Sequence, residues 1–454
     1  MNYRFSSIVG VVTLALAFGS CAPMPVSVKE RPADLTVFFT SDTRGMLRRC
    51  GCTEGQMGGL SARAAYLKAQ RGKGRMLVLD AGDSLFDGME TKEGAREFYK
   101  LKSRTIYKAM EQSGYDAASF GEYDFAYGPD FLKDAVKETS LSFVDSNLSV
   151  EAGSPEFRKG LVKGFHGLSV GVVGVLDSKF PYRSFKGSFD GVTVSAPLEA
   201  VKEEIRTISR RADIIIVLAH LSVASAEDFA KALPEADIVI QGHSQEILEA
   251  PVKTGNTLLV KGFNKGKRIG CLDLWLADGV RGGGRSGKVI KDYRYSVITI
   301  SESMPPDPEV ENIIAGYRAK LKEKALETDK AGMGEKGGYV GPDACKVCHV
   351  KEYRNWSDTK HAIAYSSLVK TGDQYDPECL PCHTTGYGHA EIENVTCESC
   401  HGSGAAHAAG NPPDKAGITR SVSEETCRGC HDDENSPGFQ FERYKSLGGA
   451  HLGQ

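Results

Sequence analysis

Four short motifs near the end of the chain combine residue types that can hold a prosthetic group covalently. Each has the pattern Cys-x-x-Cys-His, and the four occupy residues 345–349, 379–383, 397–401 and 427–431. In such a motif the two thiols attach to the vinyl groups of one haem, and the histidine becomes the proximal ligand of the iron. One motif could be half of a zinc site, but four motifs that all end in histidine favour haem c over zinc ribbons.

The pattern therefore predicts four haem c groups in a segment that transfers electrons. The attachment cysteines are Cys345, Cys348, Cys379, Cys382, Cys397, Cys400, Cys427 and Cys430, and the proximal iron ligands are His349, His383, His401 and His431.

The same segment holds four further histidines, which equals the number of motifs. They are His361, His389, His407 and His451. We expect them to be the distal iron ligands, because a short segment around four large macrocycles leaves few histidines far from an iron. His389 stands close behind its own motif and is the first candidate for an iron left open. Iron with two histidine ligands has no open position, which suits electron transfer better than substrate binding.

A second group of candidate residues lies in the first 300 residues, each just past a predicted strand. The group consists of Asp42, Asp83, Glu122, His220 and His243. We expect strands over 35–40, 76–80, 117–120, 168–176, 214–219 and 238–241, and helices over 59–70, 97–112 and 198–211. Short apolar strands separated by amphipathic helices predict α/β layers, which place their chemistry beyond the strand ends.

These blocks, in this order, resemble the calcineurin-like metallophosphoesterases, in the branch of the periplasmic 5'-nucleotidases and thiosulfohydrolases. The resemblance covers residues 33 to 300. It implies an α/β layered sandwich in which two divalent metals, bridged by the Gly-Asp carboxylate (here Asp83), activate a water for attack on phosphorus.

The departures from the family pattern fall on one metal position and on the proton donor. Arg44, Tyr123 and Gln245 stand where the family has histidine, and Glu122 replaces an asparagine. One position keeps a complete ligand set of Asp83, Glu122, His220 and His243, which suits Zn, Mn or Fe. Asp42 is a further candidate ligand, unless the Arg44 guanidinium holds it in a fork. A site without metal, a one-metal site and a working two-metal hydrolase all remain open.

Three cysteines serve neither haem nor export. Cys50 and Cys52 flank a glycine in the loop after the first strand, a spacing that resists a bridge between them. They could bind a soft metal, form a disulfide with Cys271 or react with a sulfur substrate.

The haem segment, residues 340–454, resembles the tetrahaem cytochromes c found beside hydroxylamine oxidoreductase in ammonia oxidisers. The blocks that carry the resemblance are the first motif with Glu352-Tyr353-Arg354-Asn355-Trp356 and Lys360-His361, the second with Thr384-Thr385-Gly386-Tyr387, and the third with Gly402-Ser403-Gly404 and His407. The resemblance implies closely stacked haems with two histidine ligands each, although one iron can lack its sixth ligand. We expect a small, mainly α domain with the porphyrins as its core.

The N-terminus predicts export. Arg4 precedes an apolar stretch over residues 8–18, and Gly19-Ser20-Cys21 resembles a lipobox in which Cys21 is lipidated. An ordinary signal peptide with a chance cysteine is the alternative. Ala22 after the cysteine favours an outer-membrane lipoprotein, and no later apolar run is long enough to span a membrane. Covalent haem attachment also belongs outside the cytoplasm.

Length and charge complete the organisation. The 454 residues call for two domains, and a net charge of −3 gives no sign of nucleic-acid binding. We expect a signal peptide over 1–20, a lipid-anchored tether over 21–32, the metallophosphoesterase-like domain over 33–300, a connecting helix and linker over 301–339 and the haem domain over 340–454.

Two functions compete on this sequence. The favoured one is an electron-carrying cytochrome of the cell envelope, whose partners are redox proteins or other multihaem cytochromes and whose first domain is for docking or ligand binding. The alternative is a redox or hydrolytic enzyme, in which the metal site acts on a small anion or sulfur compound and the haems exchange electrons.

Overall fold

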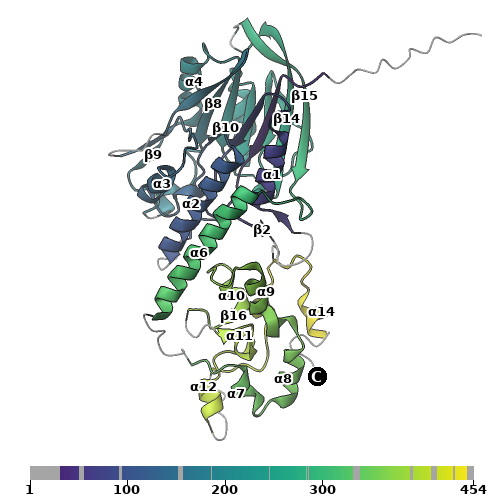
Figure 1. Ribbon diagram of the computed structural model, residues 1–454. Helices are drawn as coiled ribbons and strands as arrows, with labels where there is room; N and C mark the ends of the chain where they lie inside the picture. Colours follow the sequence, from purple (N-terminus) through teal and green to yellow (C-terminus); the bar gives the residue numbers. More distant parts are fainter. Residues whose placement is uncertain are drawn as a thin grey trace, which may run out of the picture.

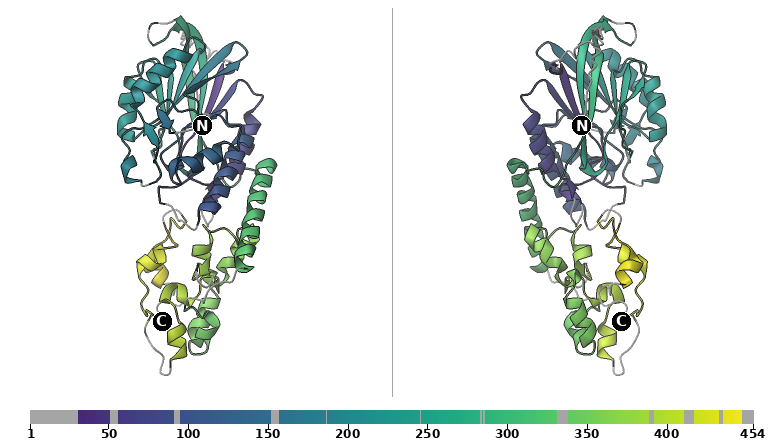
Figure 2. Two further views of the ribbon diagram at one scale, coloured as in Figure 1. Left: turned by 90° about the vertical axis from the view of Figure 1, so that its left-hand side faces the viewer. Right: turned by 90° about the vertical axis from the view of Figure 1, so that its right-hand side faces the viewer.

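The computed structural model consists of two bodies stacked along one axis and joined by a long helix (Figure 1; Figure 2). It describes residues 31–50, 56–90, 95–151, 157–185, 187–244, 246–282, 284, 286–330, 338–388, 392–410, 417–432 and 435–446. The signal segment with Cys21 lies outside the described residues, as do Cys52, Gln245, His389 and His451.

Two sheets form the centre of the upper body. The first has the strand order β15 (Ser286–Thr299), β14 (Arg268–Val280), β1 (Leu35–Thr40), β4 (Met76–Asp80) and β5 (Ala117–Ala118). The second has the order β12 (Val252–Thr254), β13 (Thr257–Lys261), β11 (Ile238–Gly242), β10 (Ile214–His220), β8 (Leu168–Leu176) and β7 (Gly160–Phe165). Two-stranded pairs β2 (Arg49–Cys50) with β3 (Met57–Gly58) and β6 (Leu148–Val150) with β9 (Val192–Val194) lie beside them.

The sheets pack face to face because their strands are apolar on both sides. In β1, Val37 and Phe39 join the core between the sheets, while Phe38 points to the other face, toward α1 (Leu60–Gln70) and α2 (Arg96–Ser113). Helices α4 (Pro197–Ile208) and α5 (Val223–Lys231) cover the outer face of the second sheet. The result is the predicted α/β sandwich, with helices outside two central sheets.

Parallel pairing fixes where the loops of this domain meet. Strand β4 pairs parallel with β1 and β5, and β10 pairs parallel with β8 and β11. The carboxyl ends of parallel strands lie at one edge of a sheet. The loops that follow β1, β4, β5, β10 and β11 therefore converge, and they include the short helices η2 (Tyr123–Phe125) and α3 (Pro129–Val136).

Helix α6 (Pro308–Lys330) connects the two bodies (Figure 1). Its buried residues Val310, Ile314, Tyr317 and Leu321 pack in the same core as α1 and α2. Within the described residues, no helix is long and apolar enough to cross a membrane.

The lower body is built of short helices with little side-chain core. They are α7 (Pro342–Lys346), α8 (Val350–Ser357), α9 (Ala364–Thr371), α10 (Leu380–His383), α11 (Cys397–His401), α12 (Ala405–Ala409), α13 (Glu424–Arg428) and α14 (Phe441–Ser446), with the strand pair β16 (Thr384–Thr385) and β17 (Ile392–Glu393). Among its described residues, Trp356, Leu368 and Val422 are the buried hydrophobic side chains. So small an apolar core leaves room for large prosthetic groups to complete it.

Candidate metal and haem sites

The loops at the metal-site edge hold residues in an unusual backbone conformation. Asp42, Arg44, Asp83 and His243 have φ between 48° and 55°, and they are four of the six non-glycine residues with positive φ in the described part of the chain. Such strain tends to persist at functional sites because the surrounding structure enforces it.

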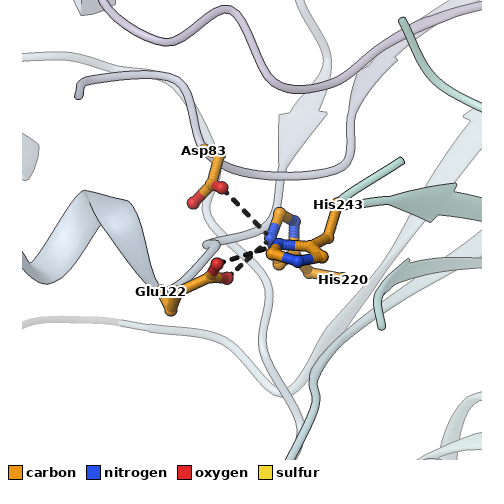
Figure 3. A group of neighbouring side chains, drawn as sticks. All are labelled: Asp83, Glu122, His220 and His243. Atoms are coloured by element: carbon orange, nitrogen blue, oxygen red, sulfur yellow. Dashed lines mark ion pairs between the residues drawn. The ribbon is translucent and has the colours of Figure 1, made fainter. Parts of the chain in front are cut away.

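Four side chains from these loops converge on one point (Figure 3). Asp83, Glu122, His220 and His243 each offer one ligand atom, and these atoms lie within 4.8 Å of one another. His220 Nε2 lies 2.9 Å from Glu122 Oε2 and 3.4 Å from Asp83 Oδ2, and His243 Nδ1 lies 2.8 Å from Glu122 Oε1. The structure thus brings together the residues that the sequence predicts as one metal position.

The convergent atoms fit a cation. Asp83 Oδ2, Glu122 Oε2, His220 Nε2 and His243 Nδ1 are all buried, and apart from the ion-pair contacts within the cluster they have no hydrogen-bond partner. Buried polar atoms normally have partners, and burying a carboxylate without compensation is costly. Two carboxylates and two imidazoles suit Zn, Mn or Fe. The donor set therefore fits a divalent metal ion.

The ring of His220 is oriented for this role. Its Nδ1 donates a hydrogen bond to the carbonyl oxygen of Ala81, 2.8 Å away, which leaves Nε2 directed toward the carboxylates. Burial opposes the charged imidazole, but Asp83 and Glu122 outweigh it and raise the pKa of His220 well above its ordinary value. Burial and the neighbouring Glu122 raise the pKa of Asp83 to about 6. The two carboxylates thus favour positive charge at the centre of the cluster, as a divalent cation would supply.

Asp124 positions the site, a role that the sequence analysis did not assign. Its carboxylate accepts hydrogen bonds from the backbone N–H groups of Asp83 (3.0 Å), Leu85 (2.9 Å) and Gly121 (2.9 Å). It thereby joins the loop after β4 to the loop after β5. Burial and Asp83 raise the pKa of Asp124 to about 8. The sequence offered one indication of this role, because Asp124 lies two residues after the candidate ligand Glu122.

We expect Asp124→Ala to lower the free energy of unfolding by about 3 kcal/mol, because it leaves three N–H groups without their acceptor. Denaturant unfolding of the full chain measures this. Asp134→Ala is the matched control, since Asp134 is exposed on α3. Equal stability of the two variants would contradict the positioning role.

Arg44 and Asp42, which the family resemblance assigns to a second metal position, pair with each other. Arg44 Nη2 donates to Asp42 Oδ1 at 3.2 Å, one hydrogen bond rather than the fork considered from the sequence. Asp42 Oδ2 also accepts from the Ser41 hydroxyl and the His243 backbone N–H. Asp42, the further candidate ligand, is therefore engaged elsewhere and lies outside the cluster of four. Burial opposes the charge on Arg44, but Asp42 and Asp83 outweigh it and raise its pKa.

Aromatic rings pack beside the metal cluster. Tyr123 lies beneath the Arg44 guanidinium, 5.2 Å from it, and Phe180 packs on His243 with ring centroids 4.6 Å apart. Burial and Glu122 raise the pKa of Tyr123. Tyr123 thus keeps its proton at neutral pH and is a weaker acid than an imidazolium.

Cys271 lies on β14, opposite Phe38 of β1, as a buried free thiol. Burial and Asp273 raise its pKa to about 12. The structure therefore does not form the disulfide considered from the sequence. Cys52 and the side chain of Cys50 lie outside the described residues.

Two pairs of histidines face each other in the haem segment. The ring centroids of His349 and His407 lie 6.1 Å apart, and those of His361 and His431 lie 6.0 Å apart. Two imidazoles on opposite sides of one metal ion have centroids roughly 6 Å apart, because each metal–nitrogen bond is about 2 Å long. The spacing fits an iron between the members of each pair.

Three of the proximal histidines have partners that orient their rings. Nδ1 of His383 lies 2.8 Å from the Ala364 carbonyl, and Nδ1 of His401 lies 2.6 Å from the Thr419 carbonyl. Nδ1 of His431 lies 3.0 Å from the Ser436 hydroxyl. An Nδ1 engaged in this way leaves Nε2 for iron. The haem segment thus fits haem c both in its ligand pairs and in the groups behind them.

Cysteines of different motifs lie in contact, and their thiols stand for the sulfurs that attach haem. A hydrogen bond between Cys345 and Cys397 raises the pKa of the first and lowers that of the second. Cys382 and Cys430 form an equivalent pair. The attachment points of the first and third motifs are therefore adjacent, and so are those of the second and fourth.

Comparisons with known proteins identify both parts of the chain. Residues 344–402 match the family described as cytochrome c554 and c-prime. An uncharacterised metallophosphoesterase of Bacillus subtilis is 31% identical over 111 residues, which are 24% of this chain and 23% of that protein. Bovine 5'-nucleotidase is 23% identical over 319 residues, 64% of this chain and 54% of that protein. The chain thus spans about half the length of the bovine relative and less of the bacterial one.

Solved structures give the same fold. A sulfate thiohydrolase of Thermus thermophilus superposes with a TM-score of 0.55 at 17% identity, covering 64% of this chain and 62% of that one. A calcineurin-like phosphoesterase of Bacillus subtilis superposes with a TM-score of 0.54 at 21% identity, covering 64% and 98%. The first domain therefore has the calcineurin-like phosphoesterase fold and is similar to 5'-nucleotidases, and the C-terminal segment matches the cytochrome c554 and c-prime family over residues 344–402.

Proposed function

We propose that this protein is an electron carrier of the cell envelope with four haem c groups, and that its first domain holds one divalent metal without acting as an ordinary nucleotidase. The observation that carries the proposal is the pairing of His349 with His407 and of His361 with His431 at about 6 Å. Imidazoles on both sides of an iron exclude substrate and leave electron exchange as its activity.

The chain's own residues support transfer between haems. Bound haem supplies one-electron oxidation and reduction at iron. Cys345 and Cys397 are neighbours, as are Cys382 and Cys430, so two motifs attach haem at adjacent points in each of two pairs. Electron transfer is fastest over short gaps, so contact of this kind favours exchange within each pair.

The test is a haem count and a spin-state measurement on the purified chain. We expect four covalent haems in a pyridine haemochrome assay and a low-spin oxidised spectrum. A count below four would refute the tetrahaem proposal. A high-spin signal from one haem would identify an open iron, with the haem near His389 as the first to examine.

The metal cluster supports a role in binding rather than in turnover. A divalent ion held by Asp83, Glu122, His220 and His243 would act as a Lewis acid toward an anion. Arg44 supplies a fixed positive charge beside it in place of a second ion. Tyr123 supplies no ready proton for a leaving group. These residues can bind and orient an anion, but they lack two parts of the hydrolytic machinery.

A second function keeps support from the completeness of this cluster. The four ligand atoms are buried and make no hydrogen bonds outside the cluster. Asp83 and His243 also have strained backbones, a feature that active sites retain. On this alternative the first domain converts a small anion or sulfur compound, and the haems exchange electrons with it or with another protein.

We also propose that the mature chain is an outer-membrane lipoprotein that begins at Cys21. Replacing Cys21 with Ser is expected to release or mislocalise the protein, because several acyl chains anchor stably where one does not. Fractionation of cell envelopes measures this. Recovery of wild-type protein in soluble form, starting at another residue, would contradict the lipid anchor.

A further inference from the structure

The two bodies meet through ion pairs of matched sign. Residues Asp373, Asp376 and Glu378 precede the second haem motif directly. Each pairs with a cation of the upper body. Arg48, from the loop after β1, contacts Asp376 at 2.8 Å, Arg318 of α6 contacts Asp373 at 2.9 Å, and Lys102 of α2 contacts Glu378 at 2.6 Å. Three basic side chains of the upper body thus form ion pairs with three acidic side chains beside one haem attachment site.

Arg48 lies at the centre of this contact. Its guanidinium pairs with Asp373 as well as Asp376, and it donates from Nη2 to Sγ of Cys379 at 3.5 Å. Both aspartates are buried, with 7% and 3% of their surfaces exposed. Burial opposes the charge on Arg48, but Asp376 and Asp373 raise its pKa, so the guanidinium stays charged. In the haem-loaded protein proposed above, Cys379 Sγ is bonded to a porphyrin, and a partly buried cation therefore lies beside that attachment point.

The same short loop reaches the metal site. Arg44, four residues before Arg48, ion-pairs with Asp42 and lies over Tyr123. On the other side of the contact, Tyr317 of α6 is buried, and its hydroxyl has no hydrogen-bond partner. The attachment site of the haem at Cys379 and Cys382 thus touches the upper body through Arg48.

We propose that Arg48 is a positioning residue for the haem attached to Cys379 and Cys382, that it raises this haem's reduction potential, and that this haem is the one joined to the first domain. The inference rests on the proposed haem binding. Adding one electron converts ferric to ferrous iron and lowers the positive charge of the haem. A nearby fixed cation therefore favours the reduced state and raises the reduction potential, whereas the two carboxylates paired with Arg48 act in the opposite direction.

The two signs of charge act in opposite directions on this equilibrium. Arg48 repels the more positive ferric haem more strongly than the ferrous haem, so removing its charge lowers the reduction potential. Asp376 attracts the ferric haem more strongly, so removing its charge raises the potential. Asp373 and Asp376 are buried and Arg48 is partly buried, which limits screening by solvent and makes each contribution large enough to measure separately.

The experiment is a spectroelectrochemical titration of the full haem-loaded chain and its variants. We expect Arg48→Gln to lower one of the four potentials by at least a tenfold change in the one-electron equilibrium constant, about 59 mV. Asp376→Asn is expected to raise the same potential, and Arg48→Lys, which keeps the charge, to retain most of the wild-type value. Arg49→Gln is the matched control, because Arg49 is the next residue and bonds instead to the Met304 carbonyl of the upper body.

His383→Met assigns the transition, since methionine ligation raises the potential of the haem that it serves. The proposal is overturned if Arg48→Gln moves no potential, moves all four together, or moves a transition other than the one that His383→Met moves. If Arg48→Gln does not fold, the opposite shift in Asp376→Asn decides the matter in the same way. A failure of the proposed haem binding is distinct from these outcomes, because it appears as a low haemochrome count in the wild-type chain.

Discussion

His407→Ala and His361→Ala are each expected to convert one haem of the chain from low-spin to high-spin. His407 faces His349 and His361 faces His431, each pair at about the distance that two ligands of one iron require. Removing the distal imidazole leaves the iron with an open position. Electron paramagnetic resonance of the oxidised protein should then show a high-spin signal equal to one haem, and the reduced protein should bind one equivalent of carbon monoxide.

Two controls separate loss of a ligand from general damage. Added imidazole should restore the low-spin state in both variants, because the site keeps its proximal histidine. His166→Ala should leave the spectrum unchanged, since His166 is exposed in the first domain, far along the sequence from the motifs. An unchanged spin state in His407→Ala or His361→Ala would mean that another residue closes that iron.

The strands of the first domain were predictable because most of them are buried on both faces. Residues 168–176 and 214–219 are continuous runs of valine, isoleucine, leucine and small residues, and they form β8 and β10. The long hairpin of β14 and β15 was not predicted. Its strands carry charged residues on a partly exposed surface, such as Lys288 and Asp292, and so lack the uninterrupted apolar run.

The metal cluster was predictable for a related reason. Asp83, Glu122, His220 and His243 each follow a strand, and parallel pairing brings those strand ends together. Asp124 could not be recognised in the same way, because its role depends on backbone N–H groups from two loops about 40 residues apart. The contact of Arg48 with Cys379 depends on how the two bodies pack, which no local pattern encodes.

In the haem segment the sequence predicts which residues bind haem but not how they pair. His349 and His407 are 58 residues apart, and His361 and His431 are 70 apart. Four distal histidines can be matched to four proximal histidines in many ways. The positions of α12 and of the short turn Lys360–Ile363 before α9 determine the two histidine pairs that the structure describes.

Hydrolysis of AMP, UDP-sugar and bis-p-nitrophenyl phosphate is expected to be at least ~10³-fold slower than the roughly 1–1,000 turnovers per second that enzymes commonly reach. Arg44 cannot coordinate a metal, because its guanidinium stays protonated and is engaged with Asp42. Tyr123 has a raised pKa and is a poor proton donor to a leaving group. Losing a metal and an acid removes several kcal/mol of transition-state stabilisation, and each 1.4 kcal/mol is a factor of ten in rate.

The assay is run with added Mn, Zn or Co, together with a metal analysis of the protein. We expect one non-haem metal per chain in the wild-type protein and none in a His220→Ala, His243→Ala double variant. That result would show that the cluster binds an ion, whether or not the protein hydrolyses these substrates. Replacing Arg44, Tyr123 and Gln245 together with histidine should restore hydrolysis if those three positions are what disables it, and the haem count of that variant serves as the folding control. Wild-type turnover in the common enzymatic range would instead mean that one metal and the Arg44 cation suffice, because a fixed guanidinium can stabilise developing negative charge as the missing ion would.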